Sequence, residues 1–123
     1  MDSRRTLALA GTLIALATVL GAFGAHALRS QLPPDRLQIF ETAVRYQFFH
    51  ALGLLAIGVL MRSMDSPVLR GSALAIVIGI MLFSGSLYLL TFGAPRALGA
   101  ITPLGGLALI GGWLGFVVAM LRH

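Results

Sequence analysis

The amino-acid sequence predicts an all-α, polytopic membrane protein: a bundle of four transmembrane helices with a short amphipathic interfacial helix before the second span. Of its 123 residues, 58% are hydrophobic and 11% are charged, and the mean hydropathy is +0.93. A soluble domain of this length leaves much of its surface in water, so it has no place for that much apolar area. The apolar surface is therefore expected to contact lipid. The length of the chain allows a single membrane domain, residues 1–123.

Four uncharged stretches have the lengths that such helices need to cross a hydrocarbon core of about 30 Å. The first, residues 7–28, extends about 33 Å as a helix. The second, residues 46–61, is shorter and needs support from Tyr46 and from the segment before it. The third and fourth, residues 71–94 and 97–121, are long enough to tilt in the membrane.

The segment at residues 34–45 has its own helical pattern. Pro34 suits the first turn of a helix, and Asp35 favours the positive end of the helix dipole. Apolar side chains then recur at spacings of three and four, at Leu37, Phe40 and Val44. This pattern predicts an amphipathic helix on the membrane surface that bends into the second span. Glu41 and Arg45, four residues apart, are placed to form an ion pair.

Two proline-bearing pairs mark further helix starts. Ser66-Pro67 lies in the short connection between the second and third spans and signals a turn or a helix start. Thr102-Pro103 fits an N-cap followed by proline at the first helical position, so the fourth helix proper is expected to begin there.

The arginines predict the orientation. With four spans, both termini share a side with the connection at residues 62–70. That side carries five arginines and the other side four, in the order Arg4, Arg5, Arg62, Arg70 and Arg122 against Arg29, Arg36, Arg45 and Arg96. The pair directly before the first span has the largest influence, which favours cytoplasmic termini. The same pair followed by an apolar run resembles a signal peptide, but the run is long and three spans follow, so we expect it to be retained.

Small residues predict how the helices pack, because lipid gives apolar helices no hydrophobic drive to associate and close backbone approach matters more. Glycines and alanines recur at four-residue spacing in the third and fourth stretches, and Gly111 with Gly115 matches the G-x-x-x-G pattern. We expect most of these glycines to pack the helices of one chain, although the same stripes also suit a homo-oligomer. The packing candidates are Gly21, Gly71, Gly79, Gly105, Gly111, Gly112 and Gly115.

Polar residues at membrane depth are the candidates for function, because they need partners there. Tyr46 and His50 share one helical face, and His26 is expected on the same side of the membrane. Ser84, Tyr88 and Thr91 form a polar stripe in the third stretch. We expect a cluster near the end of the bundle opposite the termini, either hydrogen-bonded for packing or forming a site: His26, Arg45, Tyr46, Gln47, His50, Ser84, Ser86, Tyr88 and Thr102.

Four blocks of the sequence carry a family resemblance. They are residues 21–26 (GAFGAH), residues 42–52 (TAVRYQFFHAL), residues 82–88 (LFSGSLY) and residues 99–113 (GAITPLGGLALIGGW). Together they resemble domain-of-unknown-function family 423, the family of bacterial YgdD and eukaryotic transmembrane protein 256. The resemblance implies a small multi-pass protein of the cell inner membrane, from a family without an established enzymatic activity, substrate or cofactor.

Three functions are compatible with this pattern, and the first is favoured. The chain is a non-enzymatic scaffold or assembly partner that contacts itself or another membrane protein; or a small transporter or a binder of lipid or anions at the polar cluster; or, least favoured, a haem protein with His26 and His50 as ligands. With no cysteine, and with His123 at the opposite side, a zinc site is not expected. The net charge of +5 is spread over all connections, which favours contact with phospholipid headgroups and not with nucleic acid.

Overall fold

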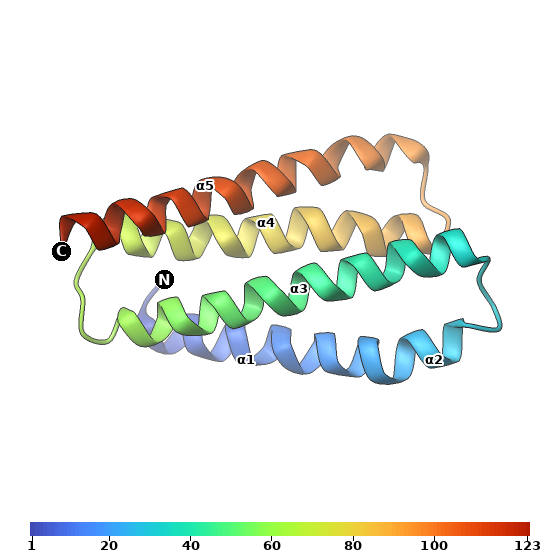
Figure 1. The fold of residues 1–123 in the computed structure, drawn as a ribbon, viewed down its shortest axis with the longest axis horizontal. Helices are drawn as coiled ribbons and strands as arrows, with labels where there is room; N and C mark the ends of the chain where they lie inside the picture. The colour runs from blue at the N-terminus through green and yellow to red at the C-terminus, as the bar shows by residue number, and fades with distance from the viewer.

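The computed structural model describes residues 1–123 and contains only helices and their connections (Figure 1). Four helical segments are long and apolar enough to cross a membrane, which confirms the predicted fold class. The first of these, Ser3–Leu28, is built from three successive elements. In chain order the elements are α1 (Ser3–Val19), the π-helical turn η1 (Leu20–Gly24), α2 (Ala25–Leu28), α3 (Pro34–Leu60), α4 (Pro67–Thr91), the 3-10 turn η2 (Arg96–Ala100) and α5 (Ile101–Arg122).

Local sequence signals explain most of the helix ends. The Asp2 carboxylate accepts a hydrogen bond from the Arg5 backbone N–H at 2.8 Å and so caps α1. The Ser66 hydroxyl accepts one from the Leu69 N–H at 3.1 Å, with proline in the first turn, so the predicted start of α4 is confirmed. Gly93, at φ +96°, takes the left-handed conformation that terminates α4.

The start of α5 differs from the prediction. Helix α5 begins at Ile101 and its N-cap position is Ala100, so Thr102 already lies in the first turn. The Thr102 hydroxyl makes no capping bond and instead contacts the Ser86 hydroxyl on α4 at 2.5 Å. A partner on a neighbouring helix has replaced the local partner that the Thr-Pro pair suggested.

The helices are antiparallel neighbours arranged in a row (Figure 1). The close contacts join α1 to α3, α3 to α4 and α4 to α5, so each span packs mainly on the spans that precede and follow it. Both termini lie at one end of the bundle along the helix axes, together with the connection between α3 and α4. The opposite end carries the connections at residues 29–33 and 92–95. The first span and α5 therefore form the two edges of the row, and each packs mainly on one neighbouring span.

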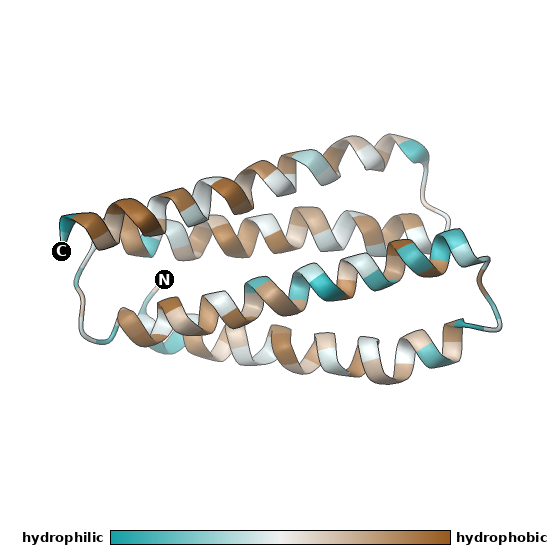
Figure 2. Cartoon of the chain, in the orientation of Figure 1, coloured by the Kyte–Doolittle hydropathy of each residue, from teal (hydrophilic) through white to brown (hydrophobic).

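The predicted interfacial helix is not a separate element. Residues 34–45 and the predicted span at residues 46–61 form the single helix α3, which is 27 residues long. No proline interrupts it after Pro34, and its apolar face is buried by protein: Phe40 and Ala43 are 1% and 0% exposed. Figure 2 shows hydrophilic positions well along α3, whereas α4 and α5 are mostly hydrophobic. The polar segment is thus continuous with the apolar part of α3 and packs on the neighbouring helices.

Glycines set the contact between α4 and α5. A Cβ added to Gly112 would lie 2.7 Å from the Ile76 side chain, and one added to Gly115 would lie 2.6 Å from the Ser72 hydroxyl. Gly79 faces Leu109 in the same way at 2.6 Å, and Gly105 lies against the backbone of α4. The two helices therefore approach each other closely along a row of glycines, where no side chains separate the backbones.

The other packing candidates are placed differently. Gly21 faces the Val44 side chain of α3, 3.2 Å from its ideal Cβ position. Gly71 and Gly111 have nothing within 4 Å of that position and point away from the other helices. Only one member of the G-x-x-x-G pair, Gly115, thus lies in a contact within the chain.

Candidate functional site

A lateral groove of about 590 Å³ lies between the first span and α3. It is open along one side, so it faces lipid rather than the interior of the bundle. Its volume is in the range of ligand-binding clefts. Its walls are mostly apolar, but they include three charged side chains; the lining residues are Ala17, Thr18, Gly21, Ala22, Ala25, Arg29, Phe40, Glu41, Val44, Arg45, Phe48 and Phe49.

The π-helical turn η1 forms part of one wall. Its hydrogen bonding runs over five residues, since the Ala25 N–H donates to the Leu20 carbonyl. Such a turn is wider than an α-helical turn, and π-helical turns are frequent at functional sites. Two of its residues are glycines that α3 approaches closely: an added Cβ at Gly24 would lie 3.2 Å from the Phe40 ring. The groove is therefore shaped by small residues on η1 and by aromatic residues on α3.

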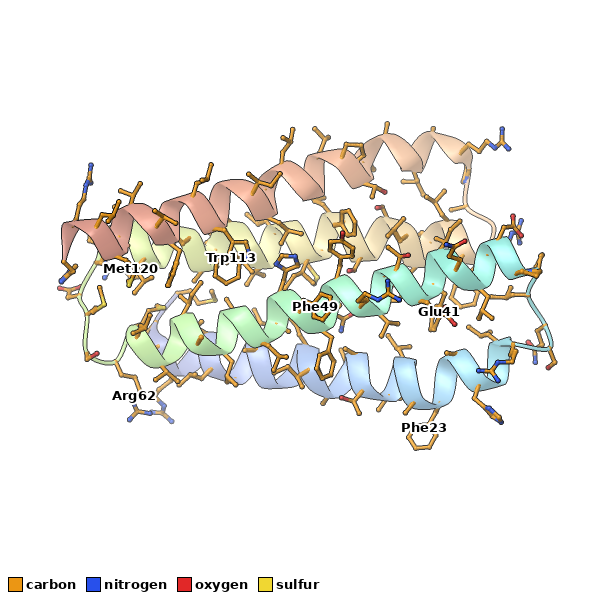
Figure 3. The ribbon with its side chains drawn as sticks, viewed as in Figure 1. Phe23, Glu41, Phe49, Arg62, Trp113 and Met120 are labelled. Atoms are coloured by element: carbon orange, nitrogen blue, oxygen red, sulfur yellow. The ribbon has the colours of Figure 1, made fainter.

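Three charged groups occupy the groove at different depths. Arg29 stands at its mouth, Glu41 lies deeper, and Arg45 lies deepest, about 13 Å along the α3 axis from Arg36. Arg45 thus lies well along a helix that is long and apolar enough to cross a membrane. Figure 3 shows Glu41 on the side of α3 that faces the α2 end of the first span, whereas Phe23 points out of the row.

The predicted ion pair between Glu41 and Arg45 is not formed. The two ion pairs of the chain, Arg5 with Asp2 and Arg70 with Asp65, both lie at the terminal end. The Arg45 side chain makes no hydrogen bond or ion pair within the chain, and the residue is exposed. Because Cβ atoms lean toward the amino-terminal end of a helix, Arg45 leans toward the mouth of the groove.

A buried set of hydrogen bonds ties the first three spans together behind the groove. The Gln47 side chain donates to the Leu13 carbonyl of α1 at 2.8 Å and accepts from the Tyr88 hydroxyl of α4 at 2.6 Å. The Ser84 hydroxyl of α4 donates to the Ala43 carbonyl of α3 at 2.7 Å. Gln47 and Ser84 are only 4% and 2% exposed, so these bonds fix the relative positions of α1, α3 and α4.

A second polar group lies between α3 and α5. The Trp113 indole N–H donates to His50 Nδ1 at 3.0 Å, and the Tyr46 ring stacks on His50 at 5.9 Å between centroids. The Trp113 ring also occupies the space left by Gly53. Figure 3 shows Trp113 reaching from α5 across α4 toward α3.

The predicted cluster is therefore divided. Gln47, Ser84 and Tyr88 meet in the first group, Tyr46 and His50 lie in the second, and Ser86 meets Thr102 between α4 and α5. Arg45 faces the groove alone, and His26 is exposed on α2 without a hydrogen bond. The polar residues extend from the middle of the bundle toward the end opposite the termini and do not gather at that end only.

His26 and His50 do not form a pair of ligands. His50 is turned toward Trp113 on α5, on the far side of α3 from the span that carries His26. No three His, Cys, Asp or Glu side chains lie close enough to hold a metal ion together.

Sequence reasoning missed the groove and the partner of His50. The sequence places Arg29 in a connection and Glu41 on a surface helix, and its spacing gives no sign that Trp113 lies opposite His50. Spacing along one helix does not show which residue of another helix lies opposite. Two signals were nevertheless present: glycines one turn apart near the end of the first span, and an arginine inside an uninterrupted helical pattern.

Fold and site together define a polytopic α-helical membrane protein with a charged lateral groove. The family model described as "Protein of unknown function (DUF423)" matches residues 20–106, and the chain belongs to this family. It is 43% identical to the UPF0382 membrane protein YwdK of Bacillus subtilis strain 168, over 88% of this chain and 89% of that protein. It is 34% identical to the UPF0382 inner membrane protein YgdD of Escherichia coli strain K12, over 99% of this chain and 93% of that one. No solved structure matches it.

Proposed function

We propose that this protein binds an anionic phospholipid in the groove between the first span and α3, with its phosphate held by Arg45. The observation that carries the proposal is an arginine without a partner inside a laterally open groove at membrane depth. A charged side chain in hydrocarbon costs several kcal/mol unless it reaches the interface or meets a counter-charge. A lipid phosphate supplies both a counter-charge and hydrogen-bond acceptors.

The charges of the groove favour an anion. Two arginines and one glutamate give the lining a net charge of +1. Both arginines of the groove, Arg29 at its mouth and Arg45 further along α3, line the route by which a headgroup would enter from the membrane surface. Guanidinium groups bind phosphate oxygens through paired N–H donors, which suits this role better than a lysine. Glu41 between them is placed to accept a hydrogen bond from a headgroup hydroxyl.

The apolar walls of the groove suit acyl chains. Phe48 and Phe49 line it on the α3 side, and Ala17, Gly21 and Ala22 line it on the first span. Phe49 is 59% exposed, so its ring offers a surface to lipid rather than to the bundle. A phospholipid can therefore lower its headgroup toward Arg45 while its chains remain in the bilayer.

The groove favours binding over the other roles weighed from the sequence. Thr18, the hydroxyl-bearing residue of the lining, donates its hydroxyl to the Ile14 carbonyl at 2.8 Å and is not held as a nucleophile. The favoured scaffold role requires a partner face, and the glycines that suggested one are largely used between α4 and α5. We therefore place the function in the groove and propose a non-enzymatic lipid-binding role.

Native mass spectrometry in mild detergent tests this proposal. We expect retention of phosphatidylglycerol by the wild-type protein, and an affinity about tenfold lower in Arg45→Gln, because a hydrogen bond to a charged group contributes about 1.5–3 kcal/mol. Arg45→Lys should keep part of the affinity. Arg96→Gln, an exposed arginine at the same end but on the other edge of the row, is the matched control and should bind as the wild type does.

Three results would contradict the proposal. One is equal loss or equal retention of lipid in Arg45→Gln and Arg96→Gln, with both variants folded by circular dichroism. Another is equal binding of phosphatidylcholine and phosphatidylglycerol, since the groove's charge then selects nothing. Binding of a free fatty acid in place of either phospholipid would also show that the phosphate is not the recognised group.

We further infer that the chain lies in the inner membrane with cytoplasmic termini, which places the mouth of the groove at the outer leaflet. The arginine distribution supports this orientation. The chain has no cysteine, so single cysteines report position cleanly. In spheroplasts, a membrane-impermeant maleimide should label Ser30→Cys directly and Ser63→Cys only after permeabilisation; the reverse pattern would contradict the orientation.

A further inference from the structure

A second pocket, of about 530 Å³, opens toward lipid between α3 and α5, separate from the lipid groove. It is lined by aromatic and aliphatic side chains around His50 and Trp113. The Tyr46 and Phe83 rings pack 4.6 Å apart between centroids, and His50 lies 6.2 Å from Trp113. The pocket therefore presents ring surfaces to whatever enters from the bilayer.

The hydrogen bond from Trp113 decides which nitrogen of His50 carries its proton. Since Nδ1 accepts from the indole N–H at 3.0 Å, Nδ1 is unprotonated and the imidazole proton is on Nε2. The Nε2–H group makes no hydrogen bond within the chain. The Tyr46 hydroxyl, one helical turn away on the same face, makes none either. The stacked Tyr46 and His50 rings, 5.9 Å apart between centroids, thus bring two donors without partners to the lining of the pocket.

Their depth restricts the partner. His50 lies near the midpoint of the helix between Arg36 and Arg62, so its Nε2–H group is close to the middle of the hydrocarbon core, and Tyr46 begins about 6 Å nearer the interface. Water does not satisfy N–H and O–H groups there, and an unsatisfied donor costs several kcal/mol. Phospholipid ester carbonyls lie near the interface, about 15 Å from His50. The acceptor must belong to a molecule that is itself soluble in the middle of the membrane.

We propose that this pocket binds a membrane-soluble quinone. Such a molecule is a flat ring with two carbonyl acceptors on an apolar tail. One carbonyl accepts from His50 Nε2 and the other from the Tyr46 hydroxyl, while the ring packs against Trp113 and Phe83. Aromatic rings favour offset or tilted stacking with a planar ligand. The assignment concerns binding only and is independent of the phospholipid proposed for the groove.

Trp113 is the single tryptophan of the chain, so its fluorescence reports on this pocket alone. Titration of the purified protein with a decyl-substituted 1,4-benzoquinone should quench the fluorescence with saturation. Decylbenzene, which has the tail and a ring but no carbonyl, should not compete. Tyr46→Phe should weaken binding about threefold to tenfold, because it removes one hydrogen bond.

His50→Phe removes the other donor and should weaken binding at least tenfold. It also leaves the Trp113 N–H without its acceptor, so Tyr46→Phe, whose hydroxyl has no bond to lose within the chain, keeps the test decisive if that variant unfolds. Phe49→Leu, on the face of α3 that lines the other groove, is the control and should bind normally. Quenching that rises linearly without saturation, or equal binding by wild type and Tyr46→Phe, would overturn the assignment.

Discussion

Gly105→Ala is expected to destabilise the protein by about 2–3 kcal/mol, a large effect for a single added methyl group. A Cβ at this position would lie 2.8 Å from the Phe83 Cα and 2.9 Å from the Leu82 carbonyl carbon, and backbone atoms cannot rotate away as a side chain can. Helices α4 and α5 must therefore separate along the track that their other glycines share. Unfolding of the purified protein, followed by circular dichroism in detergent, measures the change.

Gly111→Ala provides the matched control. Gly111 lies on the same helix but faces outward, with nothing within 4 Å of the added Cβ. Alanine is a better helix former than glycine, so this variant should be neutral or up to about 1 kcal/mol more stable. Equal destabilisation by the two variants would show that Gly105 does not mark the helix contact described above.

Gln47→Leu is expected to cost about 2 kcal/mol. The substitution keeps the approximate volume but removes the bond to the Leu13 carbonyl and the bond from the Tyr88 hydroxyl. Individual hydrogen bonds between transmembrane helices contribute about 0.6 kcal/mol on average, with a maximum near 1.7, and the Tyr88 hydroxyl is left without its partner in addition.

Tyr88→Phe separates the two bonds of Gln47. It removes only the bond to α4 and should cost about 1 kcal/mol. Because both substitutions break the same Gln47–Tyr88 bond, the double variant should be less destabilised than the sum of the two single variants. Strict additivity, measured by the same unfolding assay, would contradict the bond as the link between α3 and α4.

The fold class followed from physical constraints that act along the chain. Hydrophobic length, the proline at the start of α3 and the Ser66-Pro67 pair are local signals, and each marks the structure that it predicts. Residues 34–45, predicted as a surface segment that bends into the second span, belong to the single helix α3 and pack on protein, because amphipathic spacing does not distinguish lipid from a neighbouring helix. Phe40 faces Tyr88 and Phe92, at 5.7 and 6.5 Å between centroids, and these partners are about fifty residues away in the chain.

The site was predictable only in part. Side chains such as Gln47 and Ser84 stand out in the sequence because a polar group in hydrocarbon needs a partner. Their partners do not stand out, since the Leu13 and Ala43 carbonyls belong to the backbone and carry no mark in the sequence. The groove could not be predicted either, because it arises from the packing of two spans and from the π-helical turn η1, and the hydrophobic pattern of the sequence marks neither of these.

Arg45 decides whether the groove acts as a lipid site, and its contact with phosphate is directly measurable. In solid-state NMR of the 15N-arginine-labelled protein in phosphatidylglycerol bilayers, dephasing by lipid 31P reports which guanidinium groups contact phosphate. The Arg45 signal, assigned by its loss in Arg45→Gln, should dephase as strongly as the signals of interfacial arginines, although its Cα lies about 13 Å deeper than that of Arg36. An Arg45 signal that does not dephase while the others do would contradict the proposed function.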